Sequence, residues 1–179
     1  MKELNPDMII PGHGVIWRSH TADILDAYES WSSKTPETGA LVVFDSMWHS
    51  TELMAQAIAE GFSRKQVPVH LVDLKTEHIS DILPFVLDCK YIAAGSPTLN
   101  NNMMPNMAAF LCYLKGLSPK KREAFAFGSY GWGGQSVAQV EEELVKCGFN
   151  ICMDKIRIQY VPTKEQLLEI ESKVEALVS

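Results

Sequence analysis

Positive charge, long hydrophobic runs and paired cysteines are all scarce in this sequence. Lysine and arginine total 16 of the 179 residues against 22 aspartates and glutamates, which gives a formal net charge of -6. Because proteins bind nucleic acids largely by neutralising phosphates with basic side chains, this balance excludes nucleic acid as an expected partner. No apolar stretch is long enough to span a bilayer, and the first residues lack the apolar core of a secretory signal. We therefore expect no membrane association.

The four cysteines form neither a CxxC pair nor a dense disulfide framework. This usage is typical of a reduced, cytoplasmic protein, in which buried cysteine acts as a small hydrophobic residue. Two nucleotide-binding motifs are also missing, namely GxGxxG after the first predicted strand and GxxxxGK[ST] anywhere in the chain. Their absence disfavours a dinucleotide-binding fold and nucleoside triphosphate hydrolysis.

From Gly39 onward, strand and helix patterns alternate five times. Continuous apolar runs, which are expected for strands buried on both faces, occur at 40–45, 67–74, 91–95, 124–128 and 151–158. Helical spacing of apolar residues follows each run, at 51–65, 77–87, 104–115, 135–147 and 163–178. Pro68 favours an edge position for the second strand, Gly116 is a predicted helix stop, and Thr163 with Gln166 forms a capping box. The pattern predicts an α/β fold with a three-layer, doubly wound, five-stranded parallel sheet.

Residues 1–38 do not follow this alternation. They contain one amphipathic helix, at 21–31, and a polar segment at 32–39 that is typical of a linker. Nothing in this region is long enough to build its own core. We interpret 1–38 as the remnant of a preceding domain plus a linker, and 39–179 as the main domain.

Three short segments lie where a predicted strand passes into a helix, and a parallel sheet brings such loops to one edge. The first, 46–52, is rich in hydroxyl groups from Ser46, Ser50 and Thr51. Hydroxyls and backbone N–H groups at a helix start are suited to bind a phosphate. Ordinary N-capping of the helix by Ser50 or Thr51 is the alternative interpretation.

The other two segments, 95–101 and 129–134, are suited to border a flat ring. Pro97 presets the backbone of the first, and the second places Tyr130 and Trp132 among glycines. Stacking on a flavin accounts for aromatic residues that glycine leaves without a rigid scaffold. A simple strand–helix turn and a surface anchor for a protein partner remain alternatives. The predicted FMN-binding residues are Ser46, Met47, Trp48, His49, Ser50, Thr51, Ser96, Pro97, Thr98, Leu99, Asn100, Asn101, Ser129, Tyr130, Gly131, Trp132, Gly133 and Gly134.

These segments resemble the flavin-binding loops of the flavodoxin-like domain at the C-terminal end of flavodiiron proteins (A-type flavoproteins). Residues 10–18 further resemble the end of that family's metallo-β-lactamase-like domain, which precedes the flavodoxin-like domain. The resemblance implies the flavodoxin-like strand order 2-1-3-4-5 and FMN as the cofactor. It also implies a homodimer in which a rubredoxin-like or NAD(P)H-dependent reductase donor feeds the flavin. The flavin then passes electrons to a diiron site that reduces oxygen or nitric oxide.

Two positions depart from the family pattern. Flavodoxins commonly carry glycine in the middle of the phosphate loop, where this chain has His49. His13 matches a family iron ligand, but only five histidines are present and no HxHxDH-like cluster accompanies it. Because a diiron site needs several histidines and carboxylates, we predict no metal site and no catalytic residue in this chain. The expected role is that of an oxidoreductase component.

Three other functions stay open at this point. A flavodoxin-like NAD(P)H–quinone reductase would take hydride directly from the nicotinamide. A receiver-like phospho-acceptor module would need clustered acids at the strand ends, whereas Asp45 is alone and 95–97 occupies the acceptor position. A fragment whose flavin site no longer closes is the last alternative.

Overall fold

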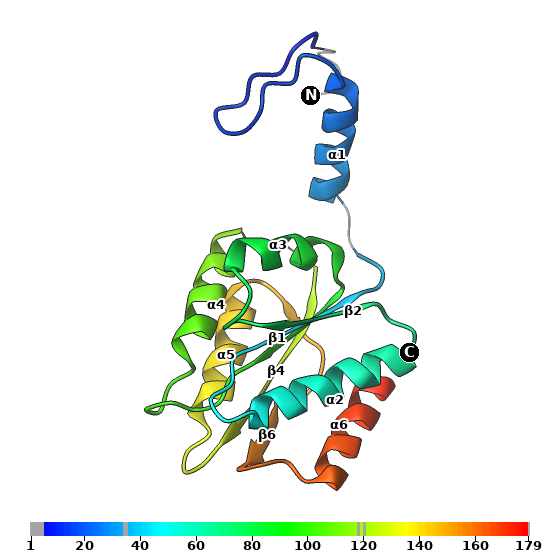
Figure 1. Ribbon diagram of the computed structural model, residues 1–179. Helices are drawn as coiled ribbons and strands as arrows, with labels where there is room; N and C mark the ends of the chain where they lie inside the picture. Colours follow the sequence, from blue (N-terminus) through cyan, green and yellow to red (C-terminus); the bar gives the residue numbers. More distant parts are fainter. Residues whose placement is uncertain (1–5, 34–35, 118, 120, 179) are drawn as a thin grey trace. The chain divides into compact units, whose positions relative to one another are not determined.

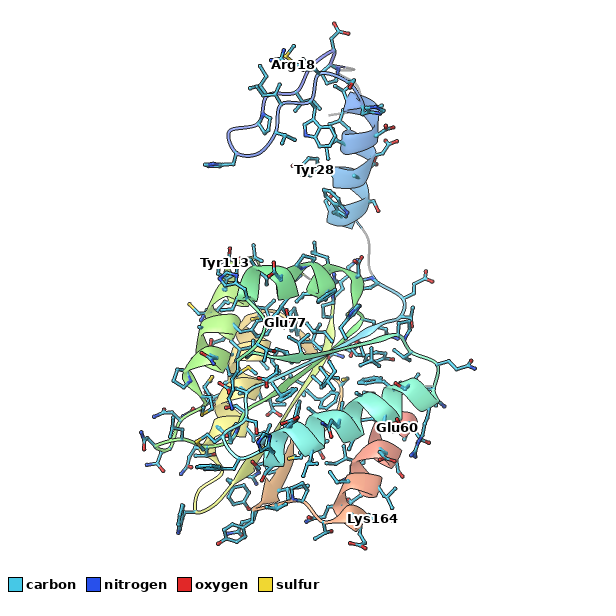
Figure 2. All side chains as sticks on the ribbon, viewed as in Figure 1. Arg18, Tyr28, Glu60, Glu77, Tyr113 and Lys164 are labelled. Carbon is cyan, nitrogen blue, oxygen red and sulfur yellow. The ribbon has the colours of Figure 1, made fainter. Side chains whose placement is uncertain are left out.

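Two units, Met1–Lys34 and Thr35–Ser179, make up the chain in the computed structural model, which describes residues 6–33, 36–117, 119 and 121–178. In the first unit, Ile9 and Trp17 form an isolated antiparallel bridge through two backbone hydrogen bonds of 3.0 and 2.9 Å. Helix α1 (Thr21–Ser33) follows, and Tyr28 packs edge-to-face on Trp31 within it, with ring centroids 5.4 Å apart (Figure 2). The predicted linker at 32–39 contains the boundary, and its residues 34–35 lie outside the described residues.

The second unit is built on a parallel sheet with the order β2-β1-β3-β4-β5, and β6 also pairs with β4 (Figure 1). This confirms the predicted order, with β2 and its preceding Pro68 at one edge. The strands are β1 (Ala40–Phe44), β2 (Val69–Asp73), β3 (Tyr91–Gly95), β4 (Glu123–Tyr130), β5 (Asn150–Ile151) and β6 (Ile156–Gln159).

Five helices cover the two faces of this sheet. They are α2 (Ser50–Arg64), α3 (Ile79–Asp88), α4 (Pro105–Leu117), α5 (Gln135–Lys146) and α6 (Lys164–Leu177). Helices α2 and α6 cover one face, and α3, α4 and α5 cover the other (Figure 1). Side chains alternate along β1, so that Leu41 and Val43 enter one core and Val42 and Phe44 the other. The apolar runs are therefore continuous because both faces are buried.

Two sequence-based expectations about element ends are wrong. Gly116 does not stop its helix, because α4 continues to Leu117 and the glycine keeps a helical backbone. The predicted last strand, 151–158, is interrupted between β5 and β6. Ala124 pairs with Ile151 of β5, and Phe127 pairs with Ile156 of β6. Three residues of β4 therefore lie opposite five residues of the β5–β6 segment. The extra residues form a bulge that no apolar pattern reveals.

Helix α2 is held against α6 by close packing and by charge. A Cβ built on Gly61 would lie 2.7 Å from the Glu171 carbonyl oxygen and 2.8 Å from Cβ of Val174, so only glycine fits at this crossing. Beside it, Arg64 forms ion pairs with Glu171 at 2.7 Å and with Glu175 at 3.2 Å. Figure 2 shows this side of α2, with Glu60 labelled. The position of α2 matters because its first turn borders the loop after β1.

We predict opposite effects of alanine at two helical glycines. Gly61→Ala forces α2 away from α6, and we expect the free energy of unfolding to fall by about 1–3 kcal/mol. Gly116→Ala meets open space, and we expect a gain of up to about 1 kcal/mol from helix propensity. Urea denaturation of both variants measures the two changes. An equal effect of the two substitutions would contradict the close crossing of α2 and α6.

Candidate functional site

The loops that follow β1, β3 and β4 meet at the carboxyl edge of the sheet. Strand β1 has β2 on one side and β3 on the other. The strand order therefore reverses at β1, because the first connection leads to one edge of the sheet and the later ones lead toward the other edge. In open α/β sheets, ligands bind in the crevice that forms at such a reversal. The three predicted loops therefore come together at the position in this fold where a ligand site is expected.

A cavity of about 400 Å³ lies between these loops. Its walls contain hydroxyl groups from the loop after β1 and aromatic and amide groups from the loops after β3, β4 and β6. No charged side chain belongs to the described lining. The lining residues are Ser46, Met47, Trp48, Ser50, Pro97, Thr98, Asn100, Asn101, Ser129, Tyr130, Gly131, Trp132, Gly133, Tyr160 and Val161.

Five of the predicted site residues lie outside this lining: His49, Thr51, Ser96, Leu99 and Gly134. Thr51 and Ser96 are fully buried. Leu99 forms a tight turn with Asn102 through two backbone hydrogen bonds of 2.9 and 2.8 Å, and Gly134 is the N-cap of α5. These positions shape the loops in the structure, whereas the other predicted residues face the cavity.

Buried hydroxyl groups connect the first and third loops. The Thr51 and Ser129 hydroxyl oxygens lie 2.9 Å apart, although the two residues are far apart in the sequence. The Thr98 backbone N–H donates to the Ser129 carbonyl at 3.2 Å and brings in the second loop. Because these contacts are buried, water does not compete for them, and the loops are fixed relative to one another.

Ser136, a residue that the sequence analysis missed, links the second loop to α5. Its hydroxyl donates to the Ser96 carbonyl at 3.0 Å and lies 2.9 Å from the Thr98 hydroxyl. The Ser96 hydroxyl in turn accepts from the Met104 backbone N–H at 2.8 Å. A Cβ on Gly128 would meet the Ser96 carbonyl oxygen at 2.0 Å, so glycine permits this close approach. A serine in the first turn of a helix, after a glycine-rich loop, was the available sequence clue.

The loop after β1 carries two polar atoms without a partner. Ser46 is only 3% exposed, and its hydroxyl forms no hydrogen bond with any described residue. The same holds for Oδ2 of the buried Asp45. Buried polar atoms are nearly always satisfied, so an orphan hydroxyl beside a cavity and a helix N-terminus indicates a site for an anionic ligand. The donor set fits a phosphate group.

His49 adopts the backbone conformation that glycine would take in this loop. It is the N-cap of α2, has a φ of 64° in the left-handed region, and makes no side-chain cap to the helix. Instead, its Nδ1 lies 2.7 Å from Oε2 of Glu52. Ser50 and Thr51, the N-caps of the alternative interpretation, are already inside the helix. The departure from glycine therefore preserves the loop geometry at some cost in backbone strain.

Four aromatic side chains, from Trp48, Tyr130, Trp132 and Tyr160, also line the cavity. Trp48 is 84% exposed and Trp132 is 97% exposed, which leaves their rings free of any core. Tyr130 is half-buried, and its carbonyl accepts from the Tyr160 backbone N–H at 2.8 Å. Tyr160 and Val161 were missed from the sequence, although every strand of a parallel sheet ends at this edge and they follow β6.

The histidines take other roles in the part of the chain that the structure describes. No group of three or more His, Cys, Asp or Glu side chains there is arranged to hold a metal ion. His13 is exposed, and His78 caps α3 by accepting from the Ser80 N–H at 3.2 Å. The ring of His70 stacks on Phe85 with centroids 4.0 Å apart. No helix within the described ranges has the length and apolarity needed to cross a membrane.

Comparison with known protein families identifies the family to which this sheet and its three loops belong. The family model for flavodoxin matches residues 42–172, which span all three loops. The chain belongs to the flavodoxin family. This family implies FMN as the ligand, and membership favours the flavin interpretation over a receiver-like module.

The chain is also similar in sequence to part of several longer proteins. It is 34% identical to the rubredoxin-oxygen oxidoreductase of Megalodesulfovibrio gigas and to the nitric oxide reductase of Moorella thermoacetica, over 174 and 175 residues. These alignments cover 96% of the chain but only 43% and 44% of those proteins. The chain thus spans less than half the length of these curated relatives.

Solved structures agree with this relationship. The rubredoxin oxygen:oxidoreductase of Desulfovibrio gigas superposes with a TM-score of 0.90 at 34% identity, over 97% of this chain and 44% of that one. The flavodiiron protein of Giardia intestinalis gives a TM-score of 0.83 at 30% identity, over 96% and 43%. These matches confirm that the chain corresponds to the C-terminal flavodoxin part of flavodiiron proteins.

We predict that the backbone at position 49 selects against branched side chains. Valine tolerates the left-handed region poorly, so His49→Val should lower the free energy of unfolding by about 1–2 kcal/mol. His49→Gly should be at least as stable as the parent chain. Gln56→Val, at an exposed helical position of α2, is the control and should cost less than about 1 kcal/mol. Equal stability of the valine and glycine variants at position 49 would contradict the assigned conformation.

Proposed function

We propose that the chain binds one FMN in the three-loop cavity and serves as an electron-transfer domain. The observation that carries this proposal is the buried, unpartnered Ser46 hydroxyl beside a cavity that four aromatic side chains also line. A monophosphate and a flat ring on one ligand match these two kinds of wall. Membership of the flavodoxin family supports the same ligand.

The phosphate end of the ligand would be held by Ser46, Ser50 and the first turn of α2. The N-terminal N–H groups of a helix have no partner within the helix and carry a partial positive charge. They are therefore able to bind a phosphate although no Lys or Arg belongs to the described lining. Thr51 keeps the turn in place through its contact with Ser129.

The ring would lie between the aromatic walls. Trp48, Tyr130, Trp132 and Tyr160 border the cavity from three loops, and the second loop adds Pro97 and the Asn100 and Asn101 amides. Stacking of a ring on exposed indoles buries apolar surface that the free chain leaves in water. A bound flavin supplies the redox chemistry, because it accepts reducing equivalents and passes electrons on one at a time. The protein contributes binding, orientation and the exclusion of water.

The wider role follows from the relatives. Their names describe oxidoreductases of oxygen or nitric oxide, and one of them names rubredoxin. We propose that this domain receives electrons from a rubredoxin-like or NAD(P)H-dependent reductase donor and delivers them to a diiron site. A homodimer is the proposed assembly. Residues 1–38 are proposed to be the end of the family's metal-binding domain, with 39–179 as the flavin domain.

We predict that Ser46→Ala weakens FMN binding without destabilising the chain. The hydroxyl has no partner to lose in the free protein, whereas a hydrogen bond to a charged phosphate contributes about 1.5–3 kcal/mol. The FMN dissociation constant should rise by about 10–100-fold, measured by quenching of flavin fluorescence. Riboflavin, which lacks the phosphate, should bind both proteins equally. Ser172→Ala on α6 is the matched control, and equal FMN affinity of all three proteins would contradict the assigned phosphate site.

We predict that NADH alone does not reduce the FMN-loaded chain. The described cavity lining has no cationic side chain for the pyrophosphate of NADH, and the first turn of α2 is assigned to the FMN phosphate. Addition of a reduced rubredoxin-like donor should bleach the flavin absorbance near-stoichiometrically. Rapid bleaching by NADH without that donor would instead support the quinone reductase alternative.

A further inference from the structure

Asp45 is the buried neighbour of Ser46, which lines the cavity, and takes no part in the function described so far. It follows β1, is fully buried, and its backbone N–H donates to the Gly95 carbonyl at 3.0 Å. Its Oδ1 accepts the Ser46 backbone N–H at 2.8 Å. Its Oδ2 is buried and makes no close hydrogen bond in the described structure, and a further hydrogen-bond interaction of the carboxyl group, with the Asn106 side chain, is weak. One carboxyl oxygen therefore orients Ser46, while the other is unsatisfied.

This placement sets two negative groups next to each other when the site is filled. A phosphate monoester carries close to two negative charges at neutral pH. Ser46 lines the cavity, and the adjacent Asp45 carboxyl is enclosed by protein, where charges are screened less than in water. An ionised Asp45 would repel the bound anion, and a protonated one would not.

The surroundings of Asp45 already favour the protonated form. Burial raises the pKa of the carboxyl group, the hydrogen bond from the Ser46 N–H lowers it, and Lys75 just beyond β2 lowers it further. Asp73 at the end of β2 raises it, and the Asn106 side chain of α4 has the weakest effect, which lowers it. The net shift is upward from the ordinary value for aspartate.

Resting on the FMN binding proposed above, we propose that Asp45 is a positioning residue that orients Ser46 and takes up a proton from solvent when an FMN phosphate binds. The proton neutralises the carboxyl group, so that it no longer repels the phosphate, and the hydrogen bond from the Ser46 N–H to Oδ1 is kept. The cofactor affinity of this chain is thereby coupled to pH through a group that does not line the cavity.

The direction of the pH dependence follows from linkage. A nearby phosphate raises the pKa of Asp45 above its value in the free protein. Binding therefore takes up protons in the pH window between the pKa of Asp45 in the free protein and its pKa in the FMN-bound protein. Within that window, FMN affinity falls as pH rises, by up to about tenfold per pH unit for one proton. Below the window Asp45 is protonated in both states, and above it the group is ionised in both states.

The test compares FMN binding to the parent chain and to Asp45→Asn from pH 4.5 to 8.5. Asparagine keeps the oxygen that accepts from Ser46 and cannot ionise. We expect the two dissociation constants to agree at the acidic end and to diverge as pH rises, with the asparagine variant binding more tightly. Riboflavin should give a ratio that does not change with pH.

Lys75→Met provides a second variant that leaves the buried residues intact, since Lys75 is exposed. Loss of the cation removes an influence that lowers the pKa of Asp45, so the window should move to higher pH. Lys65→Met, at the C-cap of α2, is the matched control and should leave the window unchanged.

The outcomes separate this proposal from the one on which it rests. Failure of the parent chain to bind FMN at any pH would overturn the proposed function. Tight FMN binding with a pH-independent ratio between parent and Asp45→Asn would overturn only the role of Asp45. A ratio that changes equally for FMN and riboflavin would also overturn it, because the effect would then not depend on the phosphate.

Discussion

Two hydroxyl contacts hold the candidate site together, Thr51 with Ser129, which is buried, and Thr98 with Ser136, which is partly buried. The first joins the start of α2 to the end of β4, and the second joins the loop after β3 to the first turn of α5. Because the loops are tied to one another and to the strand ends, the sheet beneath determines the shape of the cavity. Rigid support of this kind is what allows a loop-built site to bind a ligand without first ordering its walls.

The unsatisfied atoms of Asp45 and Ser46 contrast with this well-bonded framework. A buried polar atom without a partner costs about 1–3 kcal/mol, and folded proteins rarely retain such atoms without a functional reason. Both atoms belong to the turn between β1 and α2, where a helix N-terminus also lacks partners. The left-handed His49 adds strain to the same turn. These unfavourable free energies all occur in the turn where the chain is expected to bind an anion. The two apolar cores supply the folding free energy that offsets them.

Much of the fold was predictable because local patterns and burial agree. The run at 91–95 is β3 as predicted, and the capping box of Thr163 and Gln166 opens α6 as predicted. The three loops were also placed correctly at one edge, since a parallel sheet leaves them no other position. The errors concern where elements end. Gly116 lies inside α4, which ends one residue later, and the break at 152–155 depends on how β5 and β6 each pair with β4.

The sequence by itself determined the alternation of elements, the class of the sheet and the residues that its loops carry, because spacing and turn chemistry act locally. Only the tertiary structure decided which of those residues face the cavity and which lie behind it. It assigned Thr51 and Ser96 to the supporting network, added Ser136 and Tyr160, and enclosed Asp45 beneath Ser46. These outcomes depend on contacts between segments far apart in the chain, whose distances no local pattern encodes.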